Sequence, residues 1–172
     1  MKRLCFTGLA LAILIIGGCI LTSATFVVSE TFIFQTHDDF YFHRVDVTNT
    51  DTWQDHSDDI DFIDAVGFIM FARNLESSDI SFSLYVDDYS EGTSIPDSIP
   101  TGSATQVLEN LAIPPGESVV TYAESVKNIK NIDRLRTLAK EGKFDCFVTS
   151  TGGTGSTFVV DSIIVVVTLT AG

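Results

Sequence analysis

The sequence predicts an all-β protein, an antiparallel β-sandwich of about seven or eight strands with one or two short helices in its connections. Apolar side chains alternate with polar ones at a period of two through most of the chain. Turn-forming residues separate these segments at short intervals. No regular alternation of strands with helices is visible, which favours a sandwich over a doubly wound parallel sheet.

Four strands are expected in the first half of the body, each rich in aromatic or β-branched residues: 32–34, 40–47, 65–73 and 80–87. The third has apolar side chains on both faces, which predicts a central strand covered on both sides. Between the second and the third, residues 49–64 break the alternation, and Thr50 or Asp51 can cap a short helix there.

A long loop and a helix divide the second half. Residues 88–102 collect Gly, Ser, Thr, Asp and two prolines, so we expect a long loop there, and a loop of this length is either disordered or functional. Apolar residues at helical spacing between Val126 and Ala139 predict one helix, terminated by Gly142. The remaining strands are predicted over 107–113, 118–123, 144–149 and 157–170, with Pro114-Pro115-Gly116 as the turn between the first two.

The order of these elements, with an Asn-containing turn at Asn74 and the Pro-Pro-Gly turn before the helix, resembles the immunoglobulin-like domains of LEA-2/WHy proteins. This resemblance implies a single immunoglobulin-like sandwich over residues 30–172.

The first residues have the composition of a targeting segment. Lys2 and Arg3 precede an uncharged apolar run over residues 4–16, as in a signal peptide. The following Ile16-Gly17-Gly18-Cys19 resembles the lipobox of bacterial lipoproteins, with Ile in place of Leu three positions before the cysteine. The resemblance implies that residues 1–18 are removed, that Cys19 carries a thioether-linked diacylglycerol, and that residues 19–29 tether the domain to the membrane.

Two other fates of this segment remain open. Cleavage after Thr22-Ser23-Ala24 would release a secreted protein, and residues 4–21 are long enough to span a membrane uncleaved. In all three cases the positive flank stays cytoplasmic, and the body lies outside the cytoplasm, in the cell envelope. Two acyl chains on Cys19 would make a durable anchor, because each buried methylene contributes about 0.8 kcal/mol.

The charge balance excludes one class of partner. Loss of Lys2 and Arg3 with the signal leaves eight of the ten basic residues against 23 acidic ones, a formal net charge of −15. Basic residues supply the affinity for nucleic-acid phosphates, so we expect no nucleic-acid binding. The acidic residues are concentrated over 30–97, whereas 127–143 holds six basic residues and two acidic ones, as expected for an exposed helix face.

The three cysteines allow no disulfide within the mature domain, because Cys5 lies in the signal and Cys19 in the lipobox. Cys146 alternates with Phe144 and Val148 along an apolar strand face. We therefore expect it to be a small, buried core residue.

The three histidines lie in a segment rich in aspartates, which raises the question of metal binding. Imidazole and carboxylate ligands could hold Zn²⁺ or Ca²⁺, and the candidate ligands are His37, Asp39, His43, Asp55 and His56. In an extended strand the first three share one face. The segment lacks the Gly of a calcium loop and contains no HExxH motif, so metal binding or metal-dependent catalysis is the alternative hypothesis rather than the first.

No catalytic motif is recognisable. The Gly-rich residues 151–156 lack the Lys of a phosphate-binding loop and precede a strand, and no G-x-S-x-G motif surrounds a serine. We therefore expect a non-catalytic binding or structural module, without a cofactor. It would contact membrane lipid through its anchor and an envelope protein or polymer through the loop over 88–102.

Overall fold

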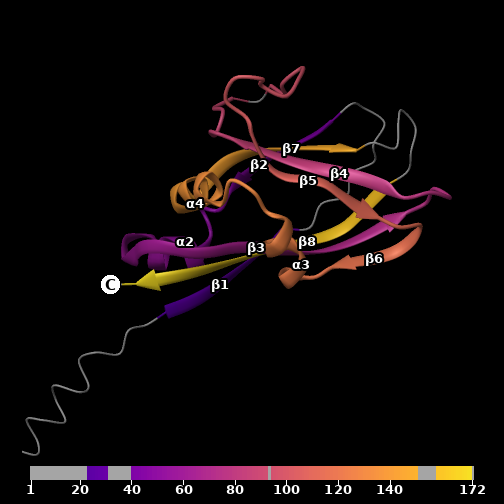
Figure 1. Ribbon diagram of the computed structural model, residues 1–172. Coiled ribbons are helices and arrows are strands. Elements are labelled where there is room, and N and C mark those ends of the chain that lie inside the picture. The colour runs from indigo at the N-terminus through magenta and orange to yellow at the C-terminus, as the bar shows by residue number, and fades with distance from the viewer. Residues whose placement is uncertain (1–22, 31–39, 93, 151–157, 172) are drawn as a thin grey trace, which may run out of the picture.

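The computed structural model describes residues 23–30, 40–92, 94–150 and 158–171. Two four-stranded antiparallel sheets face each other, which confirms the predicted sandwich (Figure 1). Sheet A contains, in spatial order, β1 (Ser23–Glu30), β8 (Phe158–Ala171), β3 (Ile60–Asn74) and β6 (Gly116–Val120). Sheet B contains β2 (Tyr41–Asp46), β7 (Lys143–Ser150), β4 (Ile80–Asp87) and β5 (Thr105–Ile113).

The strand order is that of a jelly roll rather than of an immunoglobulin-like domain. β1 pairs with β8, β2 with β7, β3 with β6 and β4 with β5, as if one long antiparallel ribbon had been rolled into two sheets. In an immunoglobulin domain the first two strands share a sheet, whereas here β1 and β2 lie in different sheets. Period-two patterning marks the strands but carries no information on which strands pair, so the sequence could not distinguish the two arrangements.

β1 was not expected. Its eight residues pair with β8 from Ser23↔Thr170 to Glu30↔Ile163. Most of the segment predicted as a tether is therefore an edge strand of sheet A. The strand predicted over 32–34 lies outside the described residues.

The short helix α2 (Asp51–His56) begins as predicted, because the Thr50 side chain accepts a hydrogen bond from the Trp53 amide at 3.3 Å. A 3₁₀ turn, η1 (Ser57–Asp59), follows it and leads into β3.

The single helix predicted over 126–139 is two helices, α3 (Tyr122–Asn128) and α4 (Ile132–Glu141). Between them Ile129 is extended and Asn131 is left-handed, with φ of 51°. The Lys130 amide donates instead to the Val107 carbonyl of β5 at 2.8 Å, so a tertiary contact interrupts the apolar periodicity. α4 ends at Gly142 with φ of 72°, as predicted.

α3 also shortens the strand predicted over 118–123, since β6 ends at Val120. Thr121 and Glu124 form a capping box that starts the helix at this point.

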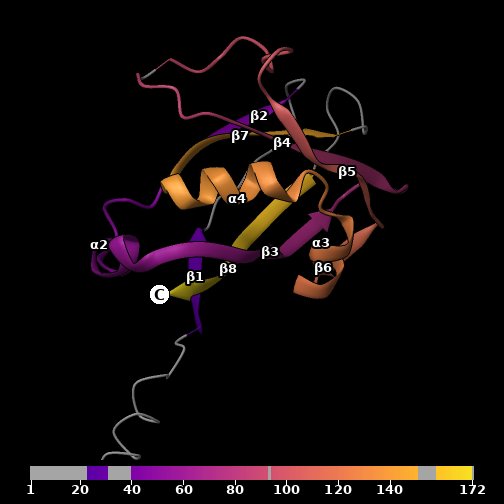
Figure 2. The same ribbon diagram turned by 60° about the vertical axis from the view of Figure 1, so that its left-hand side comes forward.

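The core has two parts. Between the sheets, side chains such as Met70, Phe158 and Cys146 form one cluster, which confirms the buried cysteine. Where the sheets diverge, α4 lies lengthwise between them (Figure 2). Its Leu135 and Leu138 contact the second cluster, which contains Ile63 and Val66 of β3, Val86 of β4 and Val107 of β5.

Candidate functional site

The loop over residues 88–104 rises above sheet B at the top of Figure 1 and is anchored to a pair of buried carboxylates. Asp87 of β4 and Asp145 of β7 are register partners on adjacent strands, and both residues are buried. Two carboxylates so close in a buried position require donors around them. The loop and its neighbours supply those donors.

Asp145 and Arg44 fix the first part of the loop. The Asp145 Oδ2 atom accepts hydrogen bonds from both the amide and the hydroxyl of Ser90, and Asp145 Oδ1 lies 3.7 Å from Arg44 Nε. The Arg44 guanidinium donates to the Ser94 carbonyl at 2.8 Å, to the Ser90 hydroxyl at 3.1 Å and to the Gly92 carbonyl. Arg44 also lies over the Phe42 ring, 5.1 Å from its centroid.

Asp87 fixes both ends of the loop at one carboxylate. Its Oδ1 atom accepts from the Asp88 amide at 2.9 Å, and its Oδ2 atom accepts from the Ser103 hydroxyl at 2.6 Å. Arg134 of α4 lies 2.9 Å from Asp88 Oδ1, which links this end of the loop to the helix. The loop is therefore held on the framework while Ile95, 70% exposed, projects into solvent.

Sequence reasoning found this loop but missed its anchors. Asp87 ends a strand whose alternate side chains are polar, so its sequence position indicates a solvated residue. Only the chain folding back over sheet B buries it, and no local signal in the sequence carries that information.

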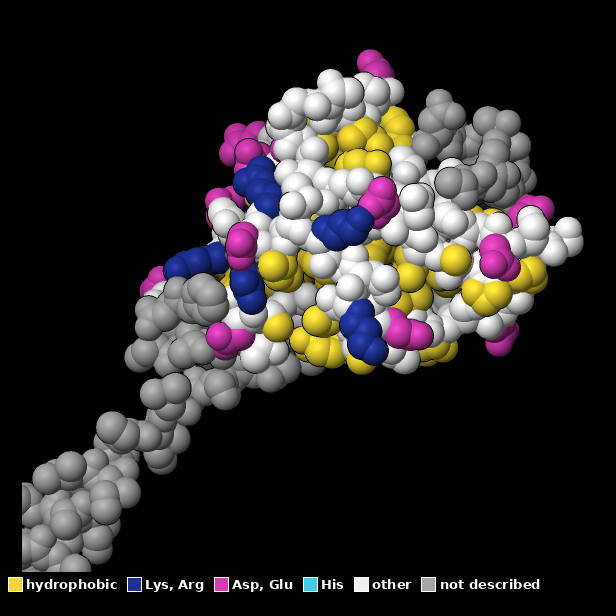
Figure 3. Space-filling view, in the orientation of Figure 1, with side chains coloured by type: hydrophobic (Ala, Val, Ile, Leu, Met, Phe, Trp, Pro, Cys, Tyr) yellow, Lys and Arg dark blue, Asp and Glu magenta, His cyan; other side chains and the backbone are white. Residues whose placement is uncertain are grey.

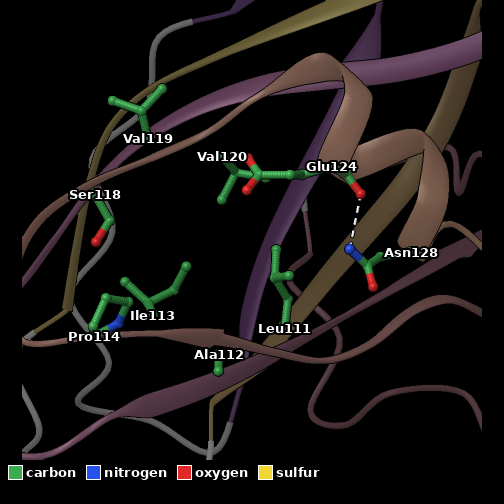
Figure 4. A pocket seen from close by; sticks show the side chains of 9 residues that line it. All are labelled: Leu111, Ala112, Ile113, Pro114, Ser118, Val119, Val120, Glu124 and Asn128. Atoms are coloured by element: carbon green, nitrogen blue, oxygen red, sulfur yellow. Dashed lines mark hydrogen bonds between the residues drawn. The ribbon is translucent and has the colours of Figure 1, made fainter.

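A second feature is a groove on the open side of the sandwich, between β5 and β6 (Figure 4). These are edge strands of opposite sheets, joined by the Pro-Pro-Gly turn. The groove has a volume of about 290 Å³. It is lined by six apolar residues and three polar ones: Leu111, Ala112, Ile113, Pro114, Val119 and Val120, with Ser118, Glu124 and Asn128.

Glu124 is the charged residue among those that line the groove. Its Oε2 atom accepts from the Thr121 amide at 2.8 Å and from the Thr121 hydroxyl at 2.7 Å. These two bonds, the amide first, lower the pKa of the Glu124 carboxyl below its ordinary value of 4.5. The Thr121 hydrogen bonds thus orient the carboxylate and favour its ionised form.

The candidate metal ligands are only partly within the described residues. His37 and Asp39 lie outside them, and the side chain of His56 is not described. His43 lies in the middle of β2 opposite Cys146, whereas Asp55 is exposed on α2. Within the described ranges, no three His, Cys, Asp or Glu side chains come together as ligands for a metal ion.

The basic residues over 127–143 are largely matched by acids of the same molecule. Lys130 pairs with Glu109, Arg134 with Asp88, Arg136 with Asp133, and Lys143 with Asp46. On the face shown in Figure 3, Lys and Arg side chains are scattered among Asp and Glu rather than gathered in one continuous patch. Two of these pairs, Arg134–Asp88 and Lys143–Asp46, join the basic block of the sequence to the acidic one.

No family model matches the sequence. No curated protein matches it either. Two solved structures that align with it are a structure of the infectious bursal disease virus Gx strain and a crystal structure of the T13 particle of the same virus. The first has a TM-score of 0.42 and 11% identity over 88% of this chain and 33% of that one. The second has a TM-score of 0.42 and 11% identity over 86% and 31%. This chain spans about a third of each.

None of the helices within the described residues is both long and apolar enough to cross a membrane.

Proposed function

We propose that this chain is an exported, lipid-anchored binding module of the bacterial cell envelope, without catalytic activity, and that the loop over 88–104 contacts its protein or polymer partner. The anchoring of the loop by Asp87, Asp145 and Arg44 supports its role in partner binding. A loop that is already ordered loses less conformational entropy on binding than a free one. Loops positioned by a rigid scaffold are where binding residues concentrate.

The exposed side chains of the loop limit the partner's chemistry. Ile95 offers an apolar contact, and the flanking exposed acids Asp88, Glu91 and Asp97 add negative charge. The mature chain's formal charge of −15 disfavours an anionic polymer. A neutral or cationic partner fits this surface.

The lipid would place the domain close to the membrane. β1 begins at Ser23, four positions after Cys19, and four extended residues reach at most about 14 Å. A diacylglycerol on Cys19 would therefore hold the sandwich against the headgroups, and the partner would have to be within reach of that surface.

Intact mass of the protein recovered from membranes of a bacterial expression host tests the anchor, with Cys19→Ala as the control. We expect an N-terminus at Cys19 with an added diacylglycerol, and loss of both in the variant. An unmodified N-terminus at Thr25 or an intact Met1 would overturn the lipid anchor.

A photo-crosslinking amino acid at position 95 tests the loop in cells. The matched control is position 75, because Leu75 is also an exposed apolar residue, 57% exposed, but lies in the turn at the opposite end of β4. We expect a discrete adduct from position 95 only. The same adducts from both positions, or none from 95, would contradict the assignment of the loop.

A further inference from the structure

We propose that the groove between β5 and β6 binds an extended segment of a partner protein that carries apolar side chains beside a lysine or arginine. This site is separate from the loop over 88–104, and its occupation does not depend on the lipid anchor.

The size and lining of the groove fit a few side chains. Its volume of about 290 Å³ is at the lower end of the roughly 300–1,000 Å³ of small-molecule sites, so it suits two or three residues better than a large ligand. The floor is apolar, since Leu111 packs against the main core cluster and Ile113 and Val120 belong to it. The rim is open: Figure 4 shows Ala112 and Ser118 on opposite walls.

The chain itself shows that the edge of β5 accepts an extended segment. The link between α3 and α4 forms an antiparallel bridge from Ile129 to Leu108, and the Lys130 amide donates to the Val107 carbonyl. The Asn131 side chain adds a hydrogen bond to the Gln106 carbonyl at 2.8 Å. Within the described residues this added segment stops at Leu108, and the groove begins further along the same edge at Leu111. A partner segment would continue the pairing by β-augmentation, in which main-chain hydrogen bonds supply affinity and side-chain pockets supply specificity.

Charge decides what kind of segment fits. The Glu124 carboxylate is fixed by Thr121 at the end of the groove next to α3, where it can pair with an ammonium or guanidinium group. The chain's net charge of −13 attracts a basic segment over longer range.

The same charges disfavour a second copy of the chain as the occupant. A symmetric pair would bring two Glu124 carboxylates into one interface, and each copy carries 13 excess negative charges. A partner of opposite charge avoids this repulsion.

The test uses the full chain, purified from membranes in detergent, and a fluorescent peptide, acetyl-Thr-Val-Lys-Val-Thr-amide, followed by anisotropy. We expect saturable binding that is lost when Glu replaces the Lys of the peptide. Ala112→Arg, which places bulk and positive charge in the groove, should weaken binding at least about tenfold. Glu124→Gln should weaken it about two- to fivefold, the range of an exposed ion pair.

Two matched controls separate the groove from general effects. Ala123→Arg makes the same substitution at an exposed position of α3 that does not line the groove, and Glu141→Gln removes an exposed acid at the end of α4, away from the groove lining and the loop over 88–104. Both should bind the peptide as the unchanged protein does, and circular dichroism should show all four variants folded.

Three results would overturn the proposal. The first is no saturable binding of the Lys peptide. The second is equal affinity for the Ala112→Arg and Ala123→Arg proteins. The third is self-association in sedimentation that Ala112→Arg abolishes, which would show that a second copy occupies the groove.

Discussion

α3 and α4 follow each other in the chain, but α4 fills the space between the sheets with apolar side chains, whereas α3 leaves a groove beside it. α4 inserts Leu135 and Leu138 between the diverging sheets and closes that part of the core. The buried side chain of α3 is Ser125, which bonds to the backbone of β3 and fills little volume. The groove lies next to α3, which contains no leucine and contributes Glu124 and Asn128 to its lining. A helix with an apolar stripe completes a core, whereas a helix held by a polar contact leaves room for a ligand.

The largest loss of stability should come from a substitution in α4, which closes the core between the sheets. Leu138 is fully buried between the sheets, so Leu138→Ala should lower the free energy of unfolding by about 2–5 kcal/mol through lost burial and the cavity left behind. Urea denaturation measures this loss. Val126→Ala, at an exposed position of α3, is the control and should cost far less; equal losses would mean that α4 does not close the core.

The anchored loop should show a smaller loss. Asp145→Asn keeps the shape of the side chain but removes the charge that faces Arg44 and Ser90. We expect a loss of about 1.5–3 kcal/mol in the free energy of unfolding, together with faster proteolysis within 88–104. Asp161→Asn removes an exposed partner of Arg73 and should change stability by about 1 kcal/mol at most. A loop that remains equally resistant to protease would show that other contacts hold it.

Ser125→Ala tests the polar contact that attaches α3. The Ser125 hydroxyl accepts from the Phe68 amide at 2.9 Å and donates to the Tyr122 carbonyl at 2.8 Å. Removal of the hydroxyl leaves the buried Phe68 amide without this acceptor, which should lower the free energy of unfolding by about 1–2 kcal/mol. Urea denaturation measures this loss. Ser118→Ala, on the rim of the groove, should be close to neutral. A neutral Ser125→Ala would mean that packing of Tyr122 and Val126 on Gly67 attaches the helix instead.

The smallest effect should be a pH dependence at the groove. The pKa of Glu124 is lowered by the Thr121 amide and hydroxyl. Its contribution to stability is therefore complete above its ordinary value of 4.5 and is lost as the pH falls through the lower folded value.

Glu124→Gln should accordingly flatten the decline of stability below pH 4.5 and leave the pH dependence above it unchanged. The pKa of Asp46 is also lowered, chiefly by the Thr48 hydroxyl, but this group is present in both proteins and cancels in the comparison. Parallel curves for the two proteins at acid pH would contradict the capping role.

Local signals located most of the elements. The Thr50 cap, the Gly142 terminus and the alternation of β4 each depend on neighbours a few residues away, so the sequence was sufficient for them. Of the candidate sites, the loop after β4 was predicted from its composition. The groove was not predicted, because the edge strands β5 and β6 lie side by side only when the two sheets stack.

By itself, then, the sequence determined a single antiparallel sandwich, its turns and the burial of Cys146, because period-two patterning and turn chemistry are local. Tertiary structure decided the jelly-roll order, the inclusion of β1 in sheet A and the break between α3 and α4. It also decided the burial of Asp87 and Asp145 and the groove beside Glu124. Each of these features depends on contacts between segments far apart in the chain, whose partners no local pattern specifies.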